Sequence, residues 1–118
     1  MTYYILSHQR IPLNLLFKPS DILIFPSDRI AEIIRIQGLS ADEVLYFRDE
    51  IVKEILDKNI HQIFMNVNNW QLSFAIAAYL IWNYNSTIWV PRIDWELTQQ
   101  GKATIMNHKI TGKERLIW

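Results

Sequence analysis

Residues 3–8 read YYILSH, an apolar run that stops abruptly at a serine and a histidine. Two later stretches share this design, because 22–27 reads ILIFPS and 63–69 reads IFMNVNN. Continuous apolar runs of about four to eight residues are typical of strands that are buried on both faces of a parallel sheet. Ligands of open α/β sheets bind outside the carboxyl ends of the strands. We therefore expect the site at the polar residues that end these three runs.

Helical patterns separate the predicted strands. Ser27 or Asp28 is expected to cap a helix with apolar residues at 30, 33 and 34, which stops near Gly38. The capping box at 40–43, SADE, predicts a second helix as far as residue 58. A third helix over 70–83 is apolar on nearly all sides, so we expect it to be buried or to lie in an interface. The predicted strands cover 3–6, 22–25, 60–67 and 87–90.

The order of these elements predicts the topology. Strands that alternate with helices imply right-handed crossovers and a mainly parallel sheet. The 8–20 crossover is close to the minimum of about a dozen residues that a parallel return requires. Residues 103–106 and 114–118 flank the turn signal Thr111-Gly112 and are expected to form a C-terminal β-hairpin. The predicted fold is α/β: one small Rossmann-like domain over residues 1–118, with a mainly parallel sheet.

Composition narrows the class of protein. The chain has 118 residues, half of them apolar, and its formal net charge is zero, which fits one folded domain and argues against binding to duplex nucleic acid. The absence of cysteine excludes disulfides and thiolate metal sites and fits a reducing compartment. The longest nearly uncharged run, 60–90, is interrupted by asparagines, so no membrane span is expected. Because no segment resembles a signal peptide, the cytoplasm is the expected location.

Common catalytic and cofactor motifs do not occur. The chain has no P-loop, no G-x-G-x-x-G, no H-E-x-x-H and no G-x-S-x-G. Its three histidines lack the spacing of metal ligands. We therefore expect no metal and no cofactor.

Ser7 and His8 are the best reactive pair by residue type. A hydroxyl can hold a phosphate oxygen, and an imidazole can move a proton near neutral pH. Adjacent strand residues point to opposite faces, so the two cannot form a simple nucleophile–base couple. A histidine that only caps backbone groups is the alternative. Ser27, at the start of a helix, suits an anion, although ordinary N-capping explains it equally well.

Amide side chains gather at the junction between the third strand and the third helix. Carboxamides can pair with the edge of an adenine, and an indole can stack on a base. A structural turn with N-cap residues is the alternative. The residues concerned are Asn66, Asn68, Asn69, Trp70 and Gln71.

Arg92 follows the fourth predicted strand, in the stretch PRIDW over 91–95. A guanidinium is well suited to clamp a phosphate. A surface ion pair between Arg92 and Asp94 is the competing interpretation.

The order of these pieces resembles the small single-domain CRISPR-associated ring nucleases, which have a CARF-like Rossmann fold. Residues 5–8, ILSH, resemble the family's first strand, which ends in Ser-His, and 24–28, IFPSD, resemble its second strand and the helix start after it. Residues 63–80 correspond to its ligand-binding strand, turn and helix, and 101–118 to its closing basic hairpin. The family's turn after the third strand tends to be glycine-rich, whereas here it reads NVNNWQ over 66–71.

The resemblance implies a function in type III CRISPR antiviral defence. The implied ligand is a cyclic oligoadenylate, cyclic tetra-adenylate above all, held across the two-fold axis of a homodimer. The implied reaction is metal-independent: a ribose 2′-hydroxyl attacks the adjacent phosphodiester and leaves a cyclic 2′,3′-phosphate. The implied roles are phosphate binding for Arg92 or Arg10, contacts to phosphate oxygens for Ser7 and Ser27, and proton movement for His8. Asn68, Asn69 and Gln71 would orient the ligand.

Two other functions remain open. A non-catalytic protein that binds the same messenger, as a sponge or sensor, would share the fold and the strand ends without turnover. A protein-interaction module would instead use the apolar third helix and the aromatic side chains of Trp82, Trp89 and Trp95.

Overall fold

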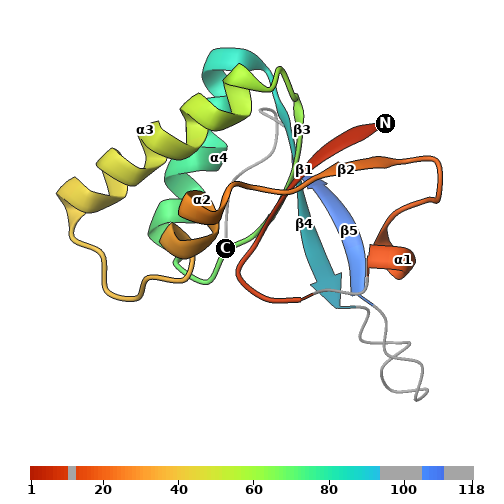
Figure 1. Ribbon diagram of the computed structural model, residues 1–118, viewed down its shortest axis with the longest axis horizontal. Coiled ribbons are helices and arrows are strands. Elements are labelled where there is room, and N and C mark those ends of the chain that lie inside the picture. The colour runs from red at the N-terminus through yellow and green to blue at the C-terminus, as the bar shows by residue number, and fades with distance from the viewer. Residues whose placement is uncertain (11–12, 94–104, 111–118) are drawn as a thin grey trace.

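The fold is a sheet with strand order β2-β1-β3-β4-β5, seen in a computed structural model that describes residues 1–10, 13–93 and 105–110 (Figure 1). The first four strands are parallel, and β5 pairs with β4 in the antiparallel direction. From β1 the chain moves outward to β2 and then returns across β1 to β3. In doubly wound sheets, the point where the order reverses in this way opens a crevice for a ligand. The strands are β1 (Thr2–Ser7), β2 (Ile22–Ile24), β3 (Gln62–Asn66), β4 (Thr87–Ile93) and β5 (Ile105–Ile110).

Three of the described helices begin at caps that the sequence predicts. Ser27 accepts a hydrogen bond from the amide of Ile30, and the capping box of Ser40 and Glu43 is complete in both directions. Asn69 caps the last helix by accepting from the amide of Leu72. The helices are α1 (Leu13–Leu16), α2 (Asp28–Ile33), α3 (Ala41–Asp57) and α4 (Trp70–Tyr84).

Helices cover the sheet unequally. In Figure 1, α2, α3 and α4 lie on one face and α1 lies on the other. β1 contributes side chains to two hydrophobic cores, one on each face of the sheet. Tyr4 and Leu6 belong to the larger core, whereas Tyr3 and Ile5 pack with Phe17 in the smaller one. This two-sided burial explains the uninterrupted apolar run that opens the sequence. Within the described ranges, no helix is long and apolar enough to cross a membrane.

The α/β class and the parallel sheet are confirmed, while some element boundaries differ. α2 ends at Ile33 and not near Gly38, because the amides of Arg35 and Ile36 bond to carbonyls three residues back and tighten its last turn. β4 extends to Ile93, since β5 pairs with it from Ile88 to Ile93. The segment predicted over 114–118 lies outside the described residues.

Candidate functional site

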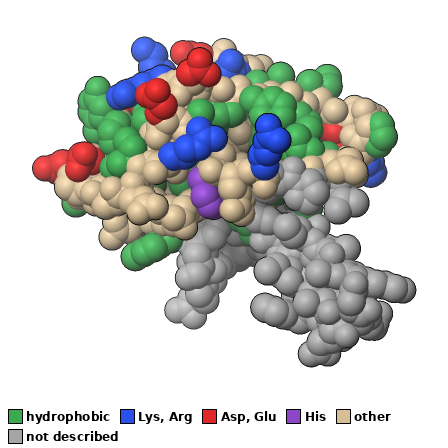
Figure 2. Space-filling model, turned by 60° about the horizontal axis from the view of Figure 1, so that its bottom comes forward, with side chains coloured by type: hydrophobic (Ala, Val, Ile, Leu, Met, Phe, Trp, Pro, Cys, Tyr) green, Lys and Arg blue, Asp and Glu red, His purple; other side chains and the backbone are tan. Residues whose placement is uncertain are grey.

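A cavity of about 430 Å³ lies at the carboxyl ends of β1 and β2. This volume falls within the range of roughly 300–1,000 Å³ that is usual for small-ligand sites. In Figure 2, which brings the lower edge of Figure 1 forward, Lys and Arg side chains stand among hydrophobic and uncharged surface. The cavity is lined by Ile5, Ser7, Gln9, Arg10, Leu13, Phe25, Pro26, Ala31 and Arg35.

Two arginines make this cavity cationic. Arg10 follows β1, and none of the contacts in the described part of the chain pairs it with a carboxylate. Arg35 follows α2, and one of its side-chain nitrogens donates to the carbonyl of Ala31 at 3.5 Å, while none of the contacts between described residues pairs it with a carboxylate. No aspartate or glutamate is among the described residues that line the cavity. Two guanidinium groups in such a lining suit a phosphate or another oxyanion.

Two other arginines among the described residues are paired with carboxylates. Arg29 on α2 lies 3.0 Å from a carboxylate oxygen of Glu50, and Arg48 lies 2.8 Å from one of Asp49. Their charge is balanced locally, whereas the charge at the cavity is not. The contrast identifies Arg10 and Arg35 as the candidate anion-binding residues.

Ser7 lines the cavity, but its hydroxyl is already engaged. Its Oγ donates to the carbonyl of Gln9 at 2.6 Å and accepts from Nδ2 of Asn66 at 3.1 Å. The hydroxyl proton is thus committed to the turn that presents Gln9 and Arg10. In this arrangement, Ser7 positions the loop and does not offer its proton to a ligand.

His8 turns away from its neighbours that line the cavity. Its amide donates to the carbonyl oxygen of Asn66 at 2.9 Å, and its ring Nδ1 lies 2.6 Å from the same oxygen. Because a carbonyl oxygen only accepts, Nδ1 carries the hydrogen and Nε2 keeps a lone pair in the neutral ring. Ser7 lines the cavity and His8 does not, so the two do not form a couple, as the sequence predicts.

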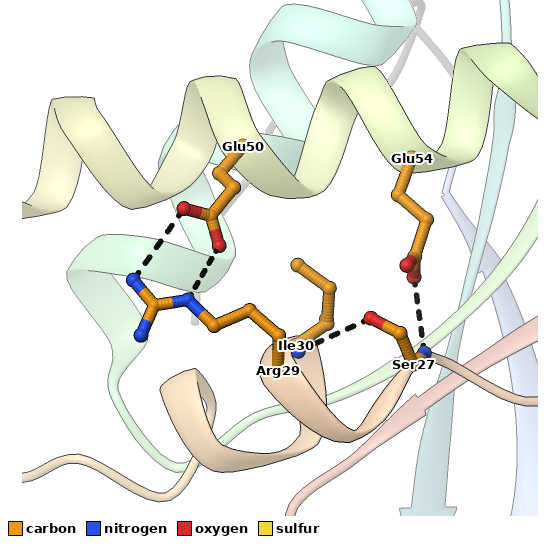
Figure 3. Close-up of polar contacts among 5 residues, drawn as sticks. All are labelled: Ser27, Arg29, Ile30, Glu50 and Glu54. Carbon is orange, nitrogen blue, oxygen red and sulfur yellow. Dashed lines mark hydrogen bonds and ion pairs between the residues drawn. The ribbon is translucent and has the colours of Figure 1, made fainter.

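Ser27 lies away from the cavity and already faces an anion (Figure 3). Its amide donates to Glu54 of α3 at 3.3 Å, and the hydroxyl of Tyr4 donates to the same carboxylate oxygen. Burial raises the pKa of Glu54, but the hydrogen bonds from Ser27 and Tyr4 outweigh it and hold the pKa below its usual value. A charged carboxylate from the protein itself therefore fills the position predicted for a ligand. Ser27 is an N-cap, the alternative that its position in the sequence left open.

The amide side chains predicted to gather between the third strand and the third helix lie in two different places. Asn66 points to Ser7, whereas Asn68, Asn69, Trp70 and Gln71 line a separate groove of about 330 Å³. The opposite wall of this groove is the loop 36–39, and no charged side chain lines it. Asn69 uses its Oδ1 for the helix cap, and Trp70 is 64% exposed. Ile36 of the groove follows Arg35 of the cavity in the chain, and the described residues that line the two hollows are different.

Arg92 lies on β4 opposite Met106 of β5. The strand order places β3 between β4 and β1, so the backbone of Arg92 is two strands away from Ser7, roughly 10 Å across the sheet. Its side chain and its suggested partner Asp94 are outside what the structure describes.

Sequence reasoning missed three lining residues. Arg35 follows Ile34 within the stretch that the apolar pattern predicts as a helix. Gln9 and Phe25 lie next to or near His8 and Ser27, whose side chains were the ones considered for chemistry. An unpaired arginine next to a predicted helix end is a signal that could have found Arg35. Phe25 is 54% exposed, which only the three-dimensional fold shows.

No group of three His, Asp or Glu side chains with the arrangement of a metal site occurs in the parts of the chain that are described. Models of known protein families, curated proteins and solved structures all give no match to this chain.

Proposed function

We propose that this protein binds a cyclic oligoadenylate at the carboxyl edge of its sheet and opens the ring without a metal ion. The observation that carries the proposal is the cavity at the carboxyl ends of β1 and β2, where the described lining includes Arg10 and Arg35 and no carboxylate. Such a site suits a phosphodiester of small size, and the neutral net charge of the chain disfavours a long polyanion. The proposal places the protein in the cytoplasm, which agrees with the absence of cysteine.

Bases of the same ligand would be held by neutral groups. Phe25 stands exposed at the rim of the cavity and can stack on a base, and Gln9 offers a carboxamide. The separate groove offers Trp70 and Gln71, and none of the described residues that line it is charged. Phosphate at the two arginines together with a base at Phe25 or Gln9 would fit an oligonucleotide better than an isolated inorganic anion.

Ring opening needs no nucleophile from the protein. The 2′-oxygen of a ribose attacks the adjacent phosphorus, the bond from phosphorus to the 5′-oxygen breaks, and that oxygen leaves as a hydroxyl. The product is a linear chain that ends in a cyclic 2′,3′-phosphate. The protein would contribute in-line alignment and stabilisation of the developing negative charge, both of which are large effects. Nε2 of His8 is the candidate acceptor of the 2′-hydroxyl proton for a ligand that extends from the cavity to His8, and the departing 5′-oxygen takes up a proton from the solvent.

Binding without cleavage is the second candidate. It is favoured by the hydrogen bonds that Oγ of Ser7 and Nδ1 of His8 already make with Gln9 and Asn66. A messenger sponge needs only the cationic cavity.

The deciding experiment incubates the full chain with cyclic tri-, tetra- and hexa-adenylate, each with and without EDTA. Chromatography follows turnover, and calorimetry follows binding. We expect tetra-adenylate to bind and to yield a cyclic 2′,3′-phosphate product equally with EDTA. Tight binding with intact ligand after hours would establish the sponge. If none of the rings binds, the proposed ligand class is wrong.

A further inference from the structure

The cavity at the carboxyl ends of β1 and β2 carries more positive charge than one phosphodiester needs. Arg10 and Arg35 both line it, and among the described residues neither forms an ion pair with a carboxylate. A phosphodiester of a nucleic acid carries one negative charge, whereas a phosphate monoester carries a charge of about −1.5 to −2 at pH 7. Two guanidinium groups therefore match the charge of a monoester more closely than that of a diester.

The size of the cavity suits a single nucleotide. Its volume of about 430 Å³ lies near the lower end of the roughly 300–1,000 Å³ that is usual for sites that enclose a small ligand. A ring of several nucleotides would place one of them in the cavity and leave the others outside. One nucleotide that carries its own phosphate is the ligand that this volume fits.

Apolar side chains line the same cavity beside the arginines. Phe25, directly after β2, is 54% exposed and offers a ring on which a base can stack. Ile5, Leu13 and Pro26 add further apolar surface. An inorganic anion alone would leave this surface without a partner, whereas a nucleotide uses it together with the arginines.

We propose that this cavity binds a nucleoside monophosphate, with the doubly charged phosphate between Arg10 and Arg35 and the base against Phe25. Such a ligand goes beyond the proposed function, because it binds as a free molecule and not as part of a ring. Its recognition depends on charge and on an aromatic ring, both of which the described lining supplies.

The same charge match has a consequence for ring opening, which rests on the proposed function. Attack by the deprotonated 2′-oxygen brings a second negative charge onto the phosphoryl group before the 5′-oxygen leaves. Cationic groups that match this charge better than that of the bound ring lower the barrier. A nucleoside monophosphate should therefore compete with the ring for the two arginines and slow its cleavage.

Calorimetry of the full chain at neutral pH compares adenosine 5′-monophosphate with its phosphate methyl ester. The two ligands share base and sugar, and the methyl group removes one phosphate charge. We expect the monophosphate to bind at least about tenfold more tightly, which is the effect of one hydrogen bond to a charged group.

Charge-removing variants test whether the arginines cause this preference. Arg35→Gln and Arg10→Gln keep a side-chain donor without the charge, so each should reduce the preference by about threefold or more, since hydrogen bonds from neutral donors are weaker. Arg29→Gln is the matched control, because Arg29 pairs with Glu50 and does not line the cavity. Circular dichroism verifies that each variant is folded.

Ribose 5-phosphate, which has the phosphate but no base, tests the role of Phe25. Phe25→Ala should weaken binding of adenosine 5′-monophosphate by at least about fivefold, the low end for a base stacked on an aromatic side chain, and leave ribose 5-phosphate unaffected. Tyr46→Ala on α3 is the control, since Tyr46 is 64% exposed and lies outside the cavity.

Equal affinities for the monophosphate and its methyl ester would overturn the proposal. A preference that persists unchanged in both folded arginine variants, or ribose 5-phosphate that binds as tightly as the nucleotide, would overturn it as well. If both nucleotide and ring bind, cleavage that saturating monophosphate leaves unchanged would place them at different sites and contradict it.

The rings used to test the proposed function give an independent result. Binding of the monophosphate without binding of any ring would support the nucleotide site and reject the proposed function. Binding of a ring without binding of the monophosphate would reject the nucleotide site and leave the proposed function standing.

Discussion

Asn66 and Ser7 face each other at the point where the strand order of the sheet reverses. They are register partners on β3 and β1, and Nδ2 of Asn66 donates to Oγ of Ser7 at 3.1 Å. The carbonyl of the same asparagine receives both the amide and the ring of His8. One residue of β3 thus holds the whole carboxyl end of β1, from which the cavity-lining residues Gln9 and Arg10 extend.

Asn66→Ala removes the side-chain bond to Ser7 and keeps the backbone bonds to His8. A typical intramolecular hydrogen bond contributes about 1 kcal/mol, so we expect the free energy of unfolding to fall by about that amount. Urea denaturation measures it. Asn68→Ala is the control, because Asn68 is exposed and none of the side-chain hydrogen bonds found in the described residues involves it. Equal losses in both variants would show that the Ser7 bond contributes nothing specific.

Glu54 predicts how stability depends on pH. Its pKa in the folded protein lies below the ordinary value of 4.5, so its hydrogen bonds with Ser27 and Tyr4 stabilise the fold above that pH. This contribution is lost as the pH falls from about 4.5 through the lowered pKa of the folded state. Glu54→Gln should therefore reduce stability at neutral pH and flatten its decline in acid. Chemical denaturation at a series of pH values follows both effects.

Glu43 needs its own control in that series. Hydrogen bonds with Ser40 also lower the pKa of Glu43, so this exposed carboxylate contributes a decline of the same sign. Glu43→Gln alone should leave most of the acid sensitivity in place, since the more buried Glu54 remains. If Glu54→Gln and wild type decline in parallel, the carboxylate at Ser27 does not stabilise the fold.

Substitutions at Gly38 test how much its left-handed backbone conformation contributes to stability. Its φ is +72°, and a Cβ added there would meet no atom within 4 Å. Gly38→Ala should therefore destabilise only through the left-handed conformation, by about 1–2 kcal/mol. Gly38→Asn should cost less, since asparagine tolerates this region better. Thermal unfolding of the pair tests the order, and an alanine variant as stable as wild type would contradict it.

The fold was predictable where the signals are local. The caps at Ser27, Ser40 and Asn69 lie within three residues of the amides that they bind, so the chain encodes them by short-range spacing. The buried runs of β1 and β3 likewise follow from their own composition. These signals sufficed to predict an α/β sheet with parallel strands.

The candidate site was less predictable, because distant segments assemble it. Glu54 reaches Ser27 from 27 positions away and takes the place predicted for an external anion. Arg35 lines the cavity from the turn that follows α2, beside residues of β1 that lie more than 25 positions earlier in the chain. Asn66 lies apart from Asn68 and Asn69 because its side chain bonds to Ser7. Tertiary contacts of this kind have no signature in a single sequence.

Arg10 and Arg35 should dominate the affinity for a phosphodiester ligand. Replacing either with alanine should weaken binding by more than ~1.5 kcal/mol, the low end for hydrogen bonds to charged groups. Arg29→Ala is the matched control, since Arg29 lies on α2 but pairs with Glu50 outside the cavity. Calorimetry with cyclic tetra-adenylate gives the values. Similar, small effects of all three substitutions would exclude the cavity as the anion site.

His8→Ala tests the contribution of the protein to chemistry. A positioned acid or base typically contributes ~10²–10⁴-fold to the rate, so single-turnover cleavage of cyclic tetra-adenylate should slow by at least ~10²-fold while the affinity is retained. The backbone bond from His8 to Asn66 does not involve the side chain, so the end of β1 should stay in place. A loss of less than about threefold, with binding kept, would remove His8 from the mechanism.

The attacking group is tested with a substrate that carries 2′-methoxy riboses. The methyl group removes the proton of the 2′-hydroxyl and blocks its oxygen, so this ring should bind to wild-type protein and remain intact. The affinity of the protein for the 2′-methoxy ring measures binding without cleavage, because the phosphates that Arg10 and Arg35 would contact are unchanged. Cleavage of the 2′-methoxy ring would require a nucleophile other than the substrate's own hydroxyl. That outcome would contradict the mechanism even if cyclic tetra-adenylate itself is a substrate.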